Sequence, residues 1–118
     1  MKLEVGMYVR LNCNYELGIG KTIGEIDEDN FIKTKFKDDF ECSLPTYMIT
    51  KASHNIYELL EEHDYIRIIT SAFFEPIYYS YGKLVIRDDI PIENYSNNFI
   101  VEVITHEQME SMSYKVGE

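Results

Sequence analysis

Apolar and polar residues alternate in short stretches along most of the chain, and a period of two predicts β-strands. In the first half the predicted strands cover residues 5–11, 21–26, 31–37 and 40–44. In the second half they cover residues 65–70, 77–81, 83–87, 99–104 and 113–116. Turn residues cluster between them at 27–30, 38–39 and 81–82. The pattern predicts a mainly β protein, with Ile23 and Ile26 directed inward.

Residues 53–63 break this alternation and predict a short helix. Ser53 is a helix-start residue, and Ile56, Leu59 and Leu60 follow it at helical spacing. We interpret this helix as a hinge, because strand-like sequence lies on both sides. The chain then divides into an N-terminal β unit at 1–52, the hinge helix at 53–63 and a C-terminal β unit at 64–118.

A second short helix is predicted at residues 105–112, inside the C-terminal unit. Thr105 is followed three positions later by Gln108, which is the spacing of a capping box. Met109 and Met112 are expected to face the core of the protein. With this helix, the fold class is a β-rich α+β fold.

The two halves share a motif near the start of each. The segment Tyr8–Leu11 has the order tyrosine, aliphatic residue, arginine, aliphatic residue, and Tyr65–Ile68 repeats this order 57 positions later. The segment Asn30-Phe31-Ile32 likewise matches Asn98-Phe99-Ile100, 68 positions later. These matches predict an internal duplication into two SH3-like or barrel-like units, and chance similarity between alternating strands is the alternative. Units of fewer than 60 residues would have to pack on each other to be stable.

The formal net charge of −10, from 21 acidic and 11 basic residues, narrows the choice of partner. Residues 1–59 carry a charge of −3 and residues 60–118 a charge of −7. Such a surface repels phosphate and disfavours direct binding of nucleic acid, whereas it attracts basic proteins. The alternative is that the charge serves solubility alone. Two cysteines without paired spacing, no signal peptide and no membrane-spanning stretch indicate a cytoplasmic protein.

No motif predicts catalysis, a metal or a cofactor. The Gly-Lys-Thr sequence at 20–22 resembles part of a phosphate-binding loop, but Tyr15 stands where the pattern needs glycine and a strand is expected to follow. The soft or imidazole ligands Cys13, Cys42, His54, His63 and His106 lack zinc-ligand spacing. Three groups of acidic residues fall in predicted turns, where Asp and Glu commonly satisfy the local backbone.

Two clusters remain as candidate contacts with a protein partner. The first is acidic and comprises Glu58, Glu61, Glu62 and Asp64 of the hinge with Asp88, Asp89 and Glu93. Acids spread in this way could imitate the phosphates of a nucleic acid, although the lysines at 33, 35 and 37 weaken that reading. The second cluster is aromatic and comprises Tyr78, Tyr79 and Tyr81. Alternation cannot bury all three tyrosines on one face, so some are exposed or covered by the other unit.

One stretch resembles a group of small phage and prophage proteins of Firmicutes. It runs Ser53-His54-Asn55-Ile56-Tyr57-Glu58-Leu59-Leu60-Glu61, followed by Asp64-Tyr65-Ile66, and the ending Ile104-Thr105-His106-Glu107-Gln108-Met109 with Tyr114-Lys115-Val116 is similar to the same group. His63 departs from the pattern, in which a glycine is expected. The resemblance implies an inhibitor of a host defence protein, with an anti-CRISPR protein as the leading kind.

Charge and the resemblance together lead to the hypothesis of a non-enzymatic acidic protein. The resemblance implies that it acts in the host cytoplasm and blocks a basic nucleic-acid-binding groove, for example on a CRISPR effector. The acidic and aromatic clusters would make the contact. One alternative is a module that binds a nucleotide signal in a pocket between the units, lined by tyrosine and by Arg10 or Arg67. The other is a structural or assembly protein that forms homodimers or larger oligomers through strand edges.

Overall fold

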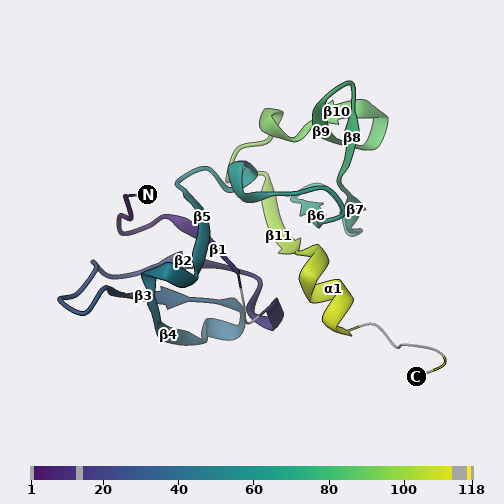
Figure 1. Ribbon diagram of the computed structural model, residues 1–118. Coiled ribbons are helices and arrows are strands. Elements are labelled where there is room, and N and C mark those ends of the chain that lie inside the picture. Colours follow the sequence, from purple (N-terminus) through teal and green to yellow (C-terminus); the bar gives the residue numbers. More distant parts are fainter. Residues whose placement is uncertain (1, 13–14, 113–116, 118) are drawn as a thin grey trace.

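The chain folds into two β units that lie side by side, as a computed structural model shows (Figure 1). The structure describes residues 2–12, 15–112 and 117. The strand predicted at 113–116 and Cys13 therefore lie outside the described residues. The prediction of a mainly β, β-rich α+β fold is confirmed.

The N-terminal unit is one five-stranded antiparallel sheet. Its strands are β1 (Tyr8–Leu11), β2 (Ile19–Thr22), β3 (Phe31–Lys35), β4 (Glu41–Pro45) and β5 (Ile49–Ser53), in the order β4-β3-β2-β1-β5. Strict alternation in β3 buries Ile32 and Thr34 and exposes the lysines on either side. Short 3₁₀ turns, η1 (Tyr15–Leu17), η2 (Lys37–Asp39) and η3 (Thr46–Met48), connect the strands.

The C-terminal unit is divided into two three-stranded sheets. One has the order β11-β6-β7, formed by Ile100–Ile104, Tyr65–Ile68 and Glu75–Pro76; the other has the order β10-β9-β8, formed by Ile90–Pro91, Lys83–Ile86 and Tyr78–Ser80. Two 3₁₀ turns, η5 (Arg87–Asp89) and η6 (Ile92–Asn94), flank β10. The only α-helix in the described part of the chain, α1 (His106–Met112), follows β11.

The two units share a strand order around their first strand. β1 pairs antiparallel with the next strand, β2, and with the last strand of its unit, β5. β6 likewise pairs antiparallel with the next strand, β7, and with the last strand, β11. The match between Tyr8 and Tyr65 therefore joins corresponding strands.

The hairpin turns of the two units also share their backbone geometry. Asp38 has φ 59° and ψ 27°, and Asp88, 50 positions later, has φ 59° and ψ 29°. The residue after each is also in the left-handed region, with φ 58° at both Asp39 and Asp89. The match between Asn30 and Asn98 does not join corresponding strands. Asn30 precedes β3, whereas Asn98 precedes β11, the last strand of its unit. The geometry of the two units corresponds, and their common origin stays a prediction.

Two changes in length explain why only the C-terminal sheet is split. In the first unit five residues lie between Asp39 and Pro45, and in the second unit one lies between Asp89 and Pro91, so β10 is much shorter than β4. After the following 3₁₀ turn, β5 begins at once, whereas β11 begins only after five further residues. The last strand consequently reaches β6 without the second hairpin beside it.

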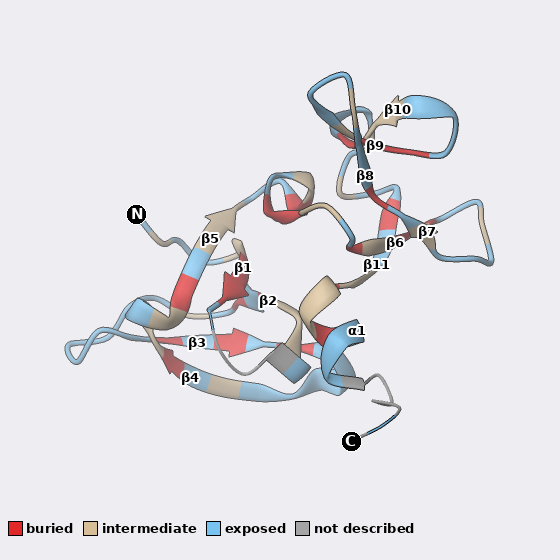
Figure 2. Ribbon diagram, turned by 45° about the vertical axis from the view of Figure 1, so that its right-hand side comes forward, coloured by how far each residue is buried: buried red, intermediate tan, exposed pale blue. Residues whose placement is uncertain are grey.

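The predicted hinge is a single 3₁₀ turn, η4 (Ile56–Leu59), and it belongs to the C-terminal core. Ile56 and Leu60 pack with the buried isoleucines of β6, β9 and β11. The N-terminal core is separate and is built around Val9, Ile32 and Phe36. Figure 2 shows buried residues in both units and exposed residues along the outer hairpins.

Some predictions about buried side chains are wrong. Ile23 and Ile26 are 38% and 41% exposed, because β2 ends at Thr22 before reaching them. Met109 is 41% exposed and does not face the core. The capping box, by contrast, is confirmed: the Thr105 amide donates to Gln108 Oε1 at 2.9 Å, and the Gln108 amide donates to Thr105 Oγ1 at 3.1 Å.

Candidate functional site

A buried arginine lies where the two units meet. Arg10 of β1 is 2% exposed, and Asp64, just before β6, is fully buried. Their side chains form a two-pronged ion pair, with Nη1 to Oδ2 at 2.6 Å and Nη2 to Oδ1 at 2.9 Å. Arg10 also donates to the carbonyl of Leu59 at 3.0 Å and to both carboxylate oxygens of Glu107 on α1. One guanidinium therefore connects the first strand, the hinge and the last helix.

Asp64 satisfies backbone groups as well as the guanidinium. Its carboxylate accepts the amide of Glu61 at 2.7 Å and the amide of His106 at 2.8 Å. The second of these amides lies in the first turn of α1, where backbone N–H groups have no helical partner. Burial alone would lower the pKa of Arg10, but the hydrogen bonds and charges of Asp64 and then Glu107 outweigh it and raise that pKa. The arginine therefore stays charged inside the protein.

Glu61 extends the network toward solvent. It is partly buried, and it accepts from Lys51 at 2.9 Å and contacts His106 Nε2 at 2.9 Å. Burial tends to raise its pKa, whereas the contacts with His106, Lys51 and Arg10 lower it, and the net direction is downward. The carboxylate is thus ionised and held between three cationic or imidazole groups.

Glu61, His106 and Glu107 also place ligand atoms within 4.8 Å of one another, which is close enough to surround a metal ion. Arg10 and Lys51 already contact the two carboxylates. A bound cation would have to displace these contacts or sit beside the guanidinium, and both cost electrostatic energy. The arrangement is therefore that of a structural ion network.

Helix α1 is fastened to the N-terminal unit at its first turn. Gln108 Nε2 donates to the carbonyl of Glu16 in η1 at 3.3 Å. A Cβ atom at Gly18 would lie 2.6 Å from Gln108 Oε1, and Gly18 has φ +70°. The left-handed backbone favours glycine here, and the side-chain amide of Gln108, which caps α1, occupies the space that a Cβ atom would need.

The Gly-Lys-Thr sequence does not form a phosphate loop. β2 runs through Gly20 and Lys21, so a strand stands where a helix N-terminus would be needed. Gly20 is buried, and a Cβ atom there would lie 2.6 Å from the ring of Phe36. The glycine is needed for packing. The Cys42 thiol is half-buried, and burial raises its pKa.

The structure separates the predicted acidic residues of the hinge. Asp64 is sealed inside the ion network, so the expectation that it contacts a partner is wrong. Glu61 is largely committed to the same network. Glu58 is exposed and accepts from Asn55, and Glu62 is half-buried beside His63. The hinge therefore offers a partner far less charge than its sequence suggested.

The second set of predicted residues lies on the small sheet β10-β9-β8. The Tyr78 hydroxyl donates to Asp89 Oδ1 at 3.1 Å. Partial burial, followed by this hydrogen bond and the charges of the two aspartates, raises the pKa of Tyr78. Tyr79 and Glu93 line a shallow hollow of about 320 Å³ with Tyr57 and Lys83. Successive residues of a strand point to opposite faces, so Tyr78 and Tyr79 belong to different faces. The structure brings the predicted residues together as two pairs.

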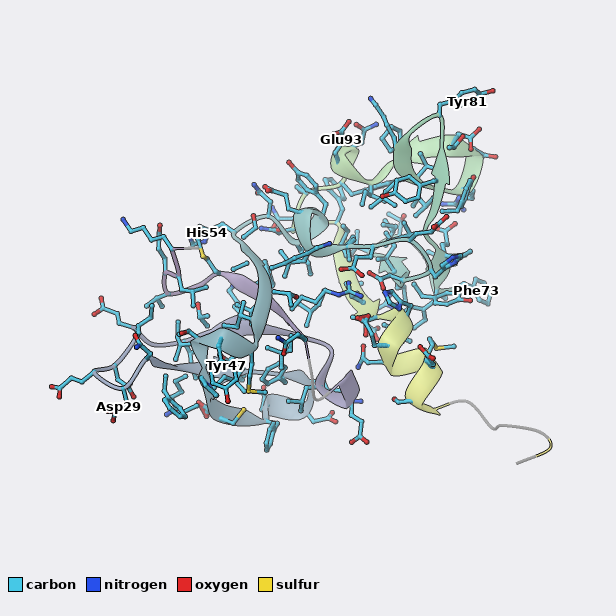
Figure 3. The ribbon with its side chains drawn as sticks, viewed as in Figure 1. Asp29, Tyr47, His54, Phe73, Tyr81 and Glu93 are labelled. Atoms are coloured by element: carbon cyan, nitrogen blue, oxygen red, sulfur yellow. The ribbon has the colours of Figure 1, made fainter. Side chains whose placement is uncertain are left out.

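Tyr81 stands at the tip of the β8–β9 hairpin. Its side chain is fully exposed, and it projects from the end of the unit in Figure 3. Its φ of 51° and the φ of 79° at Gly82 are those of a tight hairpin turn with two left-handed residues. Asp88 and Asp89 are exposed in the next turn of the same sheet.

Sequence reasoning missed the role of Arg10. The sequence suggested Arg10 only as an alternative to Arg67 in the wall of a ligand pocket between the units. The available signal was its position within Val9-Arg10-Leu11, since an arginine in a buried strand requires buried counter-charges. The acids that meet this need lie 54 and 97 residues away, and no local pattern connects them.

Comparisons with known proteins leave the chain without an assigned family. No protein-family model matches it, and neither a curated protein nor a solved structure does. Within the described residues, no helix is long and apolar enough to cross a membrane. The site chemistry above is therefore the basis for assigning a function.

Proposed function

We propose that this protein is a non-enzymatic binding protein that occupies a basic surface of another protein through its C-terminal unit. The contact surface is the tip of the β8–β9 hairpin at Tyr81 together with both faces beside it, with Tyr78 and Asp89 on one face, Tyr79 and Glu93 on the other, and the exposed Asp88. The acidic hinge contributes little to it, because Glu61 and Asp64 are held in the Arg10 network.

The observation that carries this proposal is the conformation of Tyr81. A left-handed backbone costs an L-residue other than glycine, asparagine or aspartate about 1–2 kcal/mol. The Tyr81 ring gains nothing in return from the fold, because it is fully exposed. Asparagine or glycine would suit the turn better. A fully exposed aromatic ring at a costly backbone position is explained by contact with a partner.

The surroundings of Tyr81 define the character of that partner. Residues 60–118 carry a net charge of −7, and Asp88, Asp89 and Glu93 are exposed near the hairpin. Phe73, on the outer loop of the same unit, is 78% exposed and adds apolar surface (Figure 3). Aromatic anchors surrounded by acids suit a basic surface with apolar hollows.

The resemblance of the hinge and the C-terminus to phage proteins extends the proposal to a biological role. On that basis the partner is a defence protein of the bacterial host, and a CRISPR effector with a basic nucleic-acid groove fits best. The protein would act by covering the groove, and inhibition would require no chemical step.

A comparison of two tyrosine variants tests the proposal. Tyr81→Asn removes the ring and relieves the backbone, and Tyr47→Asn removes another highly exposed ring, 78% exposed, from the N-terminal unit. Wild-type protein and both variants are immobilised, exposed to a Firmicutes lysate, and the retained proteins are quantified by mass spectrometry. A basic protein retained by the wild type and Tyr47→Asn but depleted at least tenfold by Tyr81→Asn is the expected result.

Salt and size measurements complete the test. Binding of the retained protein should weaken as ionic strength rises from 0.05 to about 0.5 M, because complementary surface charges are screened. Light scattering on the isolated protein separates this function from self-assembly, since a monomer of 13.9 kDa is expected at every concentration. Retention of the same proteins by all three forms would refute the proposal.

A further inference from the structure

A cleft of about 440 Å³ lies between the two units, on a different part of the surface from Tyr81. Its size is within the range of ligand-binding pockets. The walls come from both units, and the residues that matter for its chemistry are Tyr8, Lys21, Lys35, Lys37 and the whole of β11. A pocket between the units with a tyrosine in its wall is present, but Arg10 lies apart in the buried network.

Strand β11 presents its backbone edge to the cleft. A strand that faced the cleft with one surface would contribute every second residue. All five residues of β11, Ile100–Ile104, line the cleft instead. In the described part of the chain β11 is the end strand of its sheet and pairs only with β6. Its outer edge therefore offers unpaired N–H and C=O groups along the cleft.

The opposite wall is formed by the start of β2. β2 pairs with β3 at Lys21 and Thr22, whereas Ile19 and Gly20 extend beyond that pairing. These two residues and Lys21 line the cleft in succession. Ile19 and Ile56 add apolar surface. The cleft is therefore a channel bounded by two strand edges, with an apolar interior.

The charge of the channel is opposite to that of the protein. The chain carries −10, yet three lysines line the channel. Lys21 lies over the Tyr8 ring, 5.3 Å from its centre, and Lys35 contacts Asp39 at 3.2 Å. The one carboxylate in the lining, Glu102, pairs with Arg67 at 2.6 Å and is thus neutralised. The channel therefore has an excess of positive charge.

We propose that this channel binds an extended acidic segment of another protein, which adds to β11 as a strand. The free edge of β11 would supply main-chain hydrogen bonds to the segment. The five residues of β11 span about 17 Å. The register against β6 shifts between Ile100 and Glu102, so residues 102–104 form the regular part of this edge. Side chains on alternate positions would meet the apolar interior or the lysines, so a segment that alternates apolar and acidic residues fits best.

A small anion is the competing occupant, and the exposed strand edge argues against it. Phosphate or a small carboxylate would use the lysines but would leave the backbone groups of β11 unpaired. The proposal does not depend on the function proposed for the Tyr81 surface, because it involves a different face and a partner of opposite charge.

Selection from an unbiased library of random decapeptides, displayed on phage, tests the channel with the intact protein. Enriched peptides are expected to be acidic and to alternate apolar and acidic positions. Their affinity, measured by fluorescence anisotropy of synthetic peptides, should fall at least tenfold for the triple variant Lys21→Ala, Lys35→Ala, Lys37→Ala. Lys33→Ala is the matched control, because Lys33 lies on the same face of β3 but outside the channel and contacts Glu41.

Two further readouts separate strand addition from attraction by charge alone. Amide hydrogen exchange within Ile100–Ile104 should slow when peptide binds. N-methylation of every second peptide amide should abolish binding when those amides face β11 and should leave binding intact when they face away from it. Tyr81→Asn should leave peptide affinity unchanged, which separates this proposal from the other. Enrichment of no peptide, enrichment of basic peptides, or binding that survives the triple variant would each overturn it. Competition by inorganic phosphate without protection of β11 would indicate a small-anion site and would overturn it as well.

Discussion

The two units place a corresponding arginine in opposite environments. Arg10 and Arg67 occupy matching positions on β1 and β6, the first strand of each unit. Arg10 is buried and is held by Asp64 and Glu107, whereas Arg67 is 27% exposed and pairs with Glu102 at 2.6 Å. One strand position can therefore fasten the two units together or serve as a surface ion pair, depending on what packs against it.

The difference follows from what each unit has beside its first strand. Acids of the hinge and of α1 converge on β1, because both segments lie between the units. No third segment of the described chain covers Arg67 in this way, and it reaches Glu102 and the carbonyl of Ser71 instead. The buried network fixes the position of α1, while the C-terminal hairpins remain open to solvent. The contacts that hold the fold and the surface proposed to bind a partner are thus in different places.

Removing the two arginines should produce the largest contrast. Arg10→Ala leaves Asp64 buried without its counter-charge and should reduce the free energy of unfolding by about 3–5 kcal/mol. Arg67→Ala should cost less than about 1 kcal/mol, because exposed pairs contribute little. Chemical denaturation followed by circular dichroism measures both.

Arg10→Lys serves as the control, since it keeps a positive charge but loses the two-pronged geometry with Asp64. Its stability should fall between that of the wild type and Arg10→Ala. Equal losses for Arg10→Ala and Arg67→Ala would show that the buried network does not hold the units together.

Two glycines test the packed sheet against the open hairpin. Gly20→Ala should cost about 1–3 kcal/mol, because its Cβ atom would meet the Phe36 ring at 2.6 Å. Gly82→Ala should cost about 1 kcal/mol for a different reason, because the site has φ +79° and nothing within 4 Å. Thermal unfolding gives both values.

The causes can be separated by a second substitution at each site. Phe36→Leu should recover part of the loss from Gly20→Ala, because it removes ring atoms from the contact. Asn tolerates a left-handed backbone, so Gly82→Asn should cost less than Gly82→Ala. If Phe36→Leu simply adds its own destabilisation to Gly20→Ala, the steric explanation is wrong.

Acid should weaken the junction of the units, where the Glu61 carboxylate contacts Lys51 and His106. The pKa of Glu61 is lowered in the folded protein, so its ionised form contributes stability above its ordinary pKa of about 4.3. That contribution is lost as the pH falls through the lower, folded-state pKa. Glu61→Gln should remove it, giving a smaller decrease in stability between pH 5 and pH 3. Glu93→Gln, which removes one exposed carboxylate beside the β10-β9-β8 sheet, is the matched control for the change in net charge.

The elements that were predictable have local signals, whereas β5 was not predicted and the expected hinge helix is only the 3₁₀ turn η4. Alternation identified β3, β9 and β11, and Thr105 with Gln108 identified the start of α1. The ion network was not predictable, since Arg10 and Glu107 are 97 residues apart and burial decides which acids pair. The acids of the hinge were predicted to be surface charge because the sequence does not show which acids are buried. The exposure of the tyrosines was foreseen in outline, but their division between two faces depends on the register of β8.

A second repeated motif was present in the sequence but was overlooked. Lys37-Asp38-Asp39 and Arg87-Asp88-Asp89 are 50 positions apart, and each forms a turn with two left-handed aspartates. A buried residue comes directly before each turn, Phe36 after the end of β3 and Ile86 at the end of β9. This match identifies corresponding turns more reliably than alternating strands do, because positive φ values restrict the residues that can occupy them.

The turns provide the smallest and most direct test of the correspondence. Asp39→Gly and Asp89→Gly each create an Asp-Gly pair, which favours this turn, and each should raise stability by about 0.5–1 kcal/mol. Each substitution also removes one exposed contact, Lys35 with Asp39 in the first unit and Tyr78 with Asp89 in the second. The two gains should therefore agree within about 0.5 kcal/mol in thermal unfolding. A gain in stability at one turn and a loss at the other would show that the turns are not equivalent. The two units would then share strand order without sharing the geometry that connects the strands.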